Sequence, residues 1–186
     1  MNGQLVNHFK KITVGLFLLA LIGCSGSGVK STAEMSEQFK LGSVSLTVSQ
    51  RIAPKITYHT ESELKQLLGD KVTYFLDQRG LLSHQSKANA LVIQVAYQRH
   101  FLDEQTDHPS DSLAYPRYDY DIKVMNDYTE LTHIAQKNRV FKGRFIMDID
   151  MLEGRLDSKS DEIIFIEQLA KEVVRSVDEL KNPPIF

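Results

Sequence analysis

The chain has 186 residues, in which 22 Lys and Arg stand against 24 Asp and Glu, and it contains one Cys and no Trp. A net charge of −2 gives no basic excess of the kind that contacts phosphates, so the composition argues against a nucleic-acid-binding protein. One cysteine cannot form a disulfide within the chain, and a chain of this length can bury a stabilising core without one.

A basic segment and a short apolar run begin the chain. Lys10 and Lys11 precede the eleven uncharged residues 12–22, which as a helix would span about 16 Å at 1.5 Å per residue. This is about half of the ~30 Å hydrocarbon core of a bilayer, so a transmembrane helix is not expected. The order of basic, apolar and small residues predicts a secretory signal peptide over residues 1–23.

The only cysteine follows this run, in the sequence Leu21-Ile22-Gly23-Cys24. These four residues resemble the lipobox of bacterial lipoproteins. The resemblance implies cleavage between Gly23 and Cys24, a diacylglycerol on the Cys24 thiol, and an acyl chain such as palmitate on the new amino group. In that family an aspartate after the cysteine favours retention at the inner membrane. Ser25 at this position therefore implies a lipid-anchored outer-membrane protein that faces the periplasm.

The next segment is expected to separate the membrane anchor from the folded part. Residues 24–40 are rich in Ser, Gly and Glu and show little hydrophobic periodicity, which is typical of a flexible tether. Removal of residues 1–23, which carry two lysines and no acidic residue, leaves 163 residues with a net charge of −4. This length suits one domain, which we place at residues 41–182.

The domain is predicted to begin with a strand and a helix. Strict alternation of polar and apolar residues over 42–49 predicts a half-buried strand. Thr60 and Glu63 then match a capping box, and apolar residues recur at helical spacing as far as Arg79. Gly80 is the residue type expected just after a helix, so the sequence predicts a helix over 61–79.

The middle of the chain predicts β-structure. β-branched and aromatic residues over 90–101 predict a central strand, followed by a loop over 102–117. Alternation predicts further strands over 118–125, 128–135 and 140–152, with turns at 126–127 and 137–138 and a bulge at Gly143. A last helix is predicted from a cap at Ser158–Asp161 to about Leu180, before Pro183-Pro184.

The predicted order is therefore β-α-β-β-β-β-α. Strands grouped between two helices indicate an α+β fold, an antiparallel sheet of about four to five strands with two helices packed on one face. The short turns between consecutive strands favour a meander.

A second resemblance covers at most residues 41–152. The helix that ends at Arg79-Gly80 and the strand Ala90-Leu-Val-Ile-Gln-Val95 resemble the small α+β envelope lipoproteins of Gram-negative bacteria, of the lipopolysaccharide-assembly-lipoprotein type. This resemblance implies a non-catalytic binding or assembly accessory of a periplasmic or outer-membrane complex, without a cofactor. A likeness of fold does not by itself assign a function.

Histidines and aspartates crowd the predicted loop after the central strand. His100, Asp103 and His108 lie here with Asp107 and Asp111, and such side chains can hold a divalent ion. A metal-dependent envelope hydrolase that uses His100, Asp103 and His108 is the alternative function. The spacing matches no zinc motif, and neither a P-loop nor a nucleophile elbow occurs, so we predict no enzyme and no metal site.

Two pairs of aspartates lie two residues apart on predicted strands. Asp148 with Asp150, and Asp119 with Asp121, would each share a face of the sheet. Such a pair can raise the pKa of one carboxyl and support acid–base chemistry. The same pattern also marks the solvated face of an amphipathic strand, which we favour.

An aromatic cluster follows the loop. Tyr115, Arg117, Tyr118 and Tyr120 combine residue types that often anchor protein interfaces, which makes them the candidate partner surface. Tyrosines that alternate in a half-buried strand would give the same pattern, with their hydroxyls in water, and we favour this structural interpretation. The expected partners are the membrane, through the N-terminal lipid, and an envelope protein, which could pair with an exposed strand edge.

Overall fold

The computed structural model describes residues 35–143 and 145–181. The predicted signal peptide, Cys24 with its lipid, and the tether as far as residue 34 lie outside the described residues. The elements, in chain order, are β1 (Phe39–Ser49), α1 (Glu61–Gln78), β2 (Asn89–Phe101), β3 (Leu113–Asn126), β4 (Thr129–Val140), α2 (Phe145–Leu152) and α3 (Lys159–Lys181).

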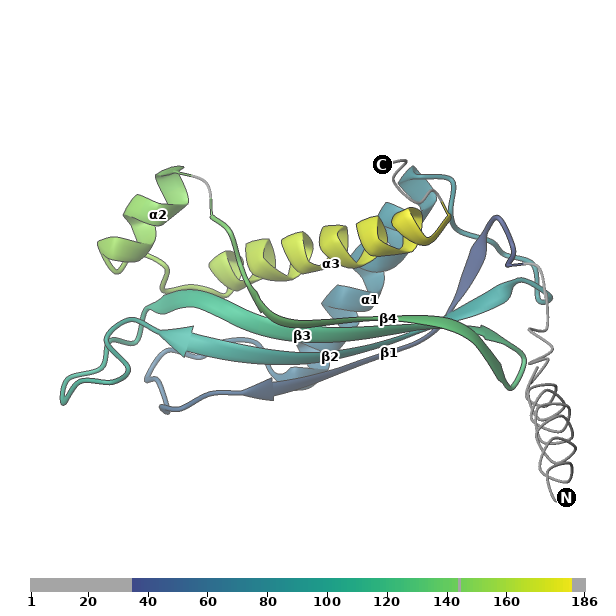
Figure 1. The fold of residues 1–186 in the computed structure, drawn as a ribbon. Helices are drawn as coiled ribbons and strands as arrows, with labels where there is room; N and C mark the ends of the chain where they lie inside the picture. Colours follow the sequence, from purple (N-terminus) through teal and green to yellow (C-terminus); the bar gives the residue numbers. More distant parts are fainter. Residues whose placement is uncertain (1–34, 144, 182–186) are drawn as a thin grey trace, which may run out of the picture. The chain divides into compact units, whose positions relative to one another are not determined.

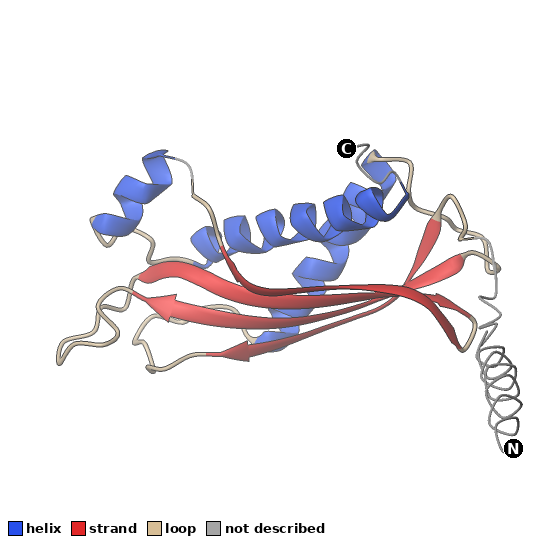
Figure 2. Ribbon diagram, viewed as in Figure 1, coloured by secondary structure: helices blue, strands red, loops and turns tan. Residues whose placement is uncertain are grey.

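Four strands form one mixed sheet in the order β1-β2-β3-β4, and α1 and α3 lie on the same face of it (Figures 1 and 2). β2–β3 and β3–β4 are antiparallel, as predicted. β1 and β2 are parallel, so the prediction of an antiparallel sheet is wrong for this pair. The reason is α1, because a helix between two strands carries the chain back across the sheet and lets the second strand run parallel to the first.

The core lies between the helices and one face of the sheet. Leu64, Leu68, Val72 and Leu76 of α1 are buried there, at the spacing that the sequence predicted. The capping box is confirmed, because the Glu63 N–H donates to Thr60 Oγ1 over 3.2 Å and the Thr60 N–H donates to Glu63 Oε2 over 2.7 Å. α3 contributes the other half of the core through Phe165, Ile166, Leu169, Ala170, Val173, Val174 and Val177.

One ion pair is buried within this core. Glu162 of α3 is fully buried, and Arg99 of β2 is 6 % exposed. Arg99 Nε donates to Glu162 Oε1 over 2.7 Å, while the His59 N–H donates to Glu162 Oε2 over 3.1 Å. The Arg99 guanidinium also donates to the Gln50 side chain and to the His59 carbonyl. The network therefore joins β2, the start of α3 and the segment that enters α1.

The predicted strand over 140–152 is wrong, because most of it forms the helix α2. Met147, Ile149 and Met151 alternate with aspartates, and a helix only two turns long can carry the same pattern. α2 ends in a Schellman motif, in which Gly154 has φ +68° and the Arg155 N–H donates to the Asp150 carbonyl over 2.8 Å. Gly154 was therefore a helix-end signal that the alternation concealed.

Two bulges correct the predicted strand limits and set which side chains face the helices. β3 begins at Leu113, within the predicted loop 102–117, and gains one residue relative to β2 between Ala114 and Arg117. In β4, the predicted turn at 137–138 is a bulge in a strand that continues to Val140. Asn138 adopts φ +53°, a left-handed conformation that asparagine tolerates better than most residues.

Candidate functional site

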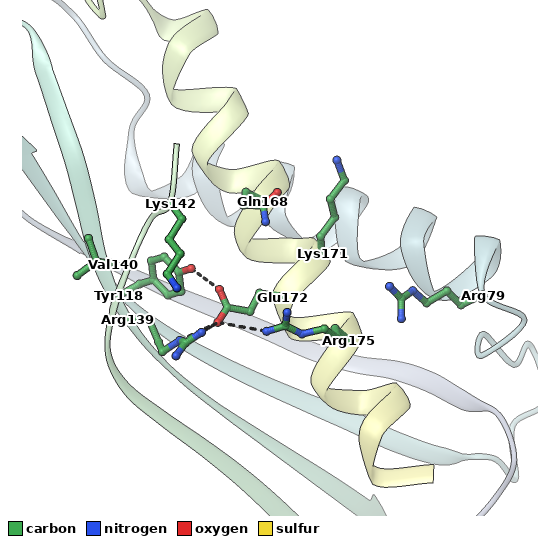
Figure 3. Close-up of a pocket in the computed structure, with 9 residues that line it drawn as sticks. All are labelled: Arg79, Tyr118, Arg139, Val140, Lys142, Gln168, Lys171, Glu172 and Arg175. Atoms are coloured by element: carbon green, nitrogen blue, oxygen red, sulfur yellow. Dashed lines mark hydrogen bonds and ion pairs between the residues drawn. The ribbon is translucent and has the colours of Figure 1, made fainter. Parts of the chain in front are cut away.

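A groove of about 310 Å³ lies between α3 and the end of β4. Figure 3 shows Lys142 reaching into it from the chain after β4, with Glu172 and Arg175 entering from α3. The side chains that line it are mainly cationic: Arg79, Tyr118, Arg139, Val140, Lys142, Gln168, Lys171, Glu172 and Arg175.

Glu172 is the centre of the groove (Figure 3). Its side chain is 10 % exposed and accepts hydrogen bonds from the Tyr118 hydroxyl and from Arg139 Nε, the latter over 2.7 Å. Arg175, one turn along α3, lies 3.9 Å from the same carboxylate. Glu172 is the single carboxylate among the lining residues, and it already accepts hydrogen bonds from Tyr118 and Arg139. These bonds fix the position of the Arg139 guanidinium in the groove.

The bulge in β4 places Arg139 in the groove. Asn138 adds one residue opposite the segment between Tyr118 and Tyr120, which pairs Arg139 with Tyr118 on the helix-covered face. The Asn138 N–H donates to Asp119 Oδ1 over 2.8 Å, and this bond holds the bulge from the neighbouring strand. Without the extra residue, period-two alternation would direct Arg139 to the opposite face of the sheet.

Cationic side chains outnumber carboxylates among the residues that line the groove. Five cations line it beside the single carboxylate of Glu172. Residues outside the lining pair with three of them: Asp178 with Arg79 and Glu167 with Lys171, each over 2.8 Å, and Glu179 with Arg175 over 3.6 Å. Lys142 has no ion-pair partner among the described residues. Lys142, and Arg175, whose two carboxylate contacts of 3.6 and 3.9 Å are longer than hydrogen bonds, are therefore the cations best placed to meet a ligand.

The protonation states in the groove are fixed by its contacts. The hydrogen bond to Glu172 raises the pKa of Arg139. Burial, and then the hydrogen bond to Glu172, raise the pKa of Tyr118 well above its usual value. Arg139 therefore stays charged and Tyr118 stays a neutral hydroxyl donor at physiological pH. Arg139 and Tyr118 thus satisfy Glu172, and the remaining lysine and arginine donors of the lining are of the type that binds an anion.

The predicted tyrosine cluster does not form one exposed surface. Tyr118 and Tyr120 are only 3 % and 2 % exposed, and their hydroxyls bond to Glu172 and to Ser176 of α3. The Tyr115 hydroxyl donates to Asp148 of α2. Arg117 is exposed. Tyr118 and Tyr120 face the helices by ordinary alternation, and the bulge between Ala114 and Arg117 brings Tyr115 to the same side; of the three, only Tyr118 lines the groove.

The His100, Asp103 and His108 side chains do not converge on a common ligand. His100 Nδ1 lies 2.7 Å from Glu104 Oε1, a partner four residues later that the sequence did not single out. Asp103 and His108 are exposed in the turn between β2 and β3. Within residues 35–143 and 145–181, no group of three or more His, Cys, Asp or Glu side chains is arranged to hold a metal ion.

Three of the four aspartates of the predicted pairs have polar contacts, whereas Asp121 Oδ1 is buried without a hydrogen-bond partner among the described residues. Asp148 and Asp150 belong to α2 rather than to a strand, and they bond to Tyr115 and Arg155 respectively. Asp119 holds the β4 bulge and lies 3.6 Å from Lys137 Nζ.

The groove itself was not predicted from the sequence. Lys171, Glu172 and Arg175 look like the ordinary charged face of an amphipathic helix, and Arg139 directly follows the turn that the sequence predicted at 137–138. The signal that could have found them is the i, i+3 spacing of Glu172 and Arg175 on α3, but this spacing is common on exposed helices.

No protein-family model matches the chain, and no curated protein is similar to it. Among solved structures, a minor lipoprotein from Acinetobacter baumannii has 14 % identical residues and a TM-score of 0.39, over 79 % of this chain and 95 % of that one. In the part of the chain that the structure describes, no helix has the length and hydrophobicity needed to cross a bilayer.

Proposed function

We propose that this chain is a lipid-anchored lipoprotein of the bacterial envelope that acts as a non-catalytic binding or assembly accessory. Leu21-Ile22-Gly23-Cys24 supports the anchor, and Ser25 supports an address at the periplasmic side of the outer membrane. Two or three acyl chains hold a protein stably on a bilayer, whereas one chain gives only marginal binding. The folded domain then acts within reach of its tether.

The cationic groove is the observation that carries the binding function. Its free hydrogen-bond capacity is almost entirely of the donor type, and its single carboxylate is already bound by Tyr118 and Arg139. Charge-assisted hydrogen bonds from lysine and arginine are the strongest that a protein offers to a carboxylate or phosphate. The partner is therefore expected to be an envelope component that presents such a group.

A titration with pyrophosphate tests the groove. The lipidated protein in phosphatidylcholine nanodiscs should bind this anion by calorimetry. Lys142→Gln with Arg175→Gln should weaken binding about tenfold or more, since a hydrogen bond to a charged group contributes roughly 1.5–3 kcal/mol. Lys87→Gln is the matched control, because Lys87 is exposed in the turn before β2 and lies outside the groove. Equal losses in the two proteins, or no binding at all, would contradict the proposal.

A further inference from the structure

The cationic groove adjoins a second, more apolar cavity of about 640 Å³ between α2 and α3. The two spaces share Lys142, Gln168 and Lys171, so two of the cations that line the groove also line one side of the apolar cavity. The apolar part of the second cavity is lined by Phe141, Ile146, Met147, Leu156 and Ile164.

Part of this apolar lining is exposed to solvent. Ile146 of α2 is 74 % exposed, and Ile164 of α3 is 49 % exposed. Phe141 and Leu156 are buried beneath them, with exposed fractions of 5 % and 3 %. An apolar space that is open at one side and has a buried floor is the arrangement that proteins use to take up apolar groups.

α2 also exposes apolar side chains, while its charged side chains are bound by other protein groups. Its two aspartates are held by protein groups, Asp148 by the Tyr115 hydroxyl and Asp150 by Arg155 Nε over 3.0 Å. The residues that it exposes most are instead Phe145 at 78 %, Ile146 at 74 % and Leu152 at 71 %. A surface helix in water normally buries such side chains and exposes its charges.

The acidic groups at the cavity are also already bound. Glu167 lies 2.8 Å from both Lys71 and Lys171, and Asp161 Oδ2 accepts from the Ser158 N–H at the start of α3. Among the described residues that line the cavity, each carboxylate therefore already has a protein partner, and a negative ligand group beside Lys142 would not lie next to an unpaired one.

We propose that the two spaces together bind a single-chain anionic amphiphile, such as a fatty acid or a monoacyl phosphate. Its carboxylate or phosphate contacts Lys142 and Arg175, and its hydrocarbon chain occupies the cavity between α2 and α3. The volume lies within the range of about 300–1,000 Å³ of sites that enclose one small ligand, which favours one chain over several. This inference rests on the proposed function, because it assigns the anionic group to the same groove.

The absence of tryptophan from the chain allows a direct test. Ile164→Trp places a reporter in the wall of the cavity, and Tyr128→Trp places a control at a side chain that is fully exposed in the turn between β3 and β4. Each lipidated variant, in phosphatidylcholine nanodiscs, is titrated with a brominated fatty acid and with the brominated fatty alcohol of equal length. We expect saturable quenching of the Ile164→Trp reporter, with the acid effective at about tenfold lower concentration than the alcohol.

Charge variants then locate the headgroup. In the Ile164→Trp background, Lys142→Gln with Arg175→Gln should abolish the advantage of the acid over the alcohol, whereas Lys87→Gln should preserve it. Because these side chains are exposed, the substitutions should leave the fold intact, and thermal unfolding of each variant checks this.

Three results would overturn the inference. The first is equal quenching by the acid and the alcohol. The second is equal quenching of the Ile164→Trp and Tyr128→Trp reporters, which indicates simple partition into the bilayer. The third uses nanodiscs made with brominated phospholipid and no added fatty acid: quenching of the Ile164→Trp reporter there indicates that α2 docks on the membrane. If pyrophosphate still binds in any of these cases, the anion-binding function stands and only the amphiphile is excluded.

Discussion

Single residues decide the electrostatics inside this protein. Glu162 and Arg99 are charged side chains placed in the core, where an ion without a partner is costly. Their pairing is supplemented by the His59 N–H and by the Gln50 side chain, so that most of the donors and acceptors are used. The network holds the start of α3 on β2, and through α3 it fixes the position of Glu172 in the groove.

Removal of Glu162 should therefore destabilise the whole domain. We expect Glu162→Ala to lower the free energy of unfolding by about 3–5 kcal/mol, because it leaves the Arg99 guanidinium buried without its carboxylate. Urea denaturation measures this loss. Glu179→Ala, which removes an exposed carboxylate on the same helix, should cost less than about 1 kcal/mol. A loss below about 1 kcal/mol for Glu162→Ala would show that the buried pair contributes little.

At the scale of elements, local signals and tertiary contacts agree for α1 and α3. The capping box at Thr60 begins α1, and Lys159 at the start of α3 lies 3.0 Å from Glu63 of the same box. One carboxylate thus caps one helix and contacts the next. The Thr60 N–H, then Lys159 and the Thr60 hydroxyl, lower the pKa of Glu63 to about 2.

This lowered pKa predicts a dependence of stability on pH. The carboxyl of Glu63 has a lower pKa in the folded protein than in the unfolded chain, so its contribution is fully present above about pH 4.5 and is lost as the pH falls toward 2. The stability difference between the wild type and Glu63→Gln should shrink over this range. Urea denaturation at several pH values measures it, and a difference that stays constant from pH 6 to pH 2.5 would contradict the assignment.

α2 shows where local patterns mislead. Met147, Ile149 and Met151 alternate with aspartates as in a strand, yet Gly154 and Arg155 close a helix. Two turns are too short for a periodic pattern to separate helix from strand. The parallel pairing of β1 with β2 has a similar cause, because the direction of a strand depends on the crossover that precedes it and not on its own residues.

At the scale of the whole molecule, the proposed arrangement separates anchoring from binding. The lipid on Cys24 would hold the chain at the membrane, and the groove between α3 and β4 would take up an anionic group near the bilayer. The groove lies on the helix-covered side of the sheet, so an anionic group bound there would leave the exposed strand edges open to an envelope protein.

The anchor is tested independently of the groove. Cys24→Ser should leave an uncleaved precursor and abolish incorporation of labelled palmitate, because the lipid needs the thiol and the cleavage follows lipidation in the family that this segment resembles. Immunoblotting, metabolic labelling and membrane fractionation measure these effects. Palmitate labelling that persists in Cys24→Ser would overturn the proposed anchor.

The sequence by itself determined the α+β class, the two long helices with their caps, the central strand and the motif that predicts a lipid at Cys24. These are local properties, set by hydrophobic period and by hydrogen bonds that span three or four residues. Only the tertiary structure decided the parallel pairing of β1, the helical state of α2 and the groove. Arg139 and Lys142 come from the end of β4 and the residues after it, and Glu172 from α3, while a bulge that the sequence marked only as a turn directs Arg139 inward, so their convergence is a property of packing.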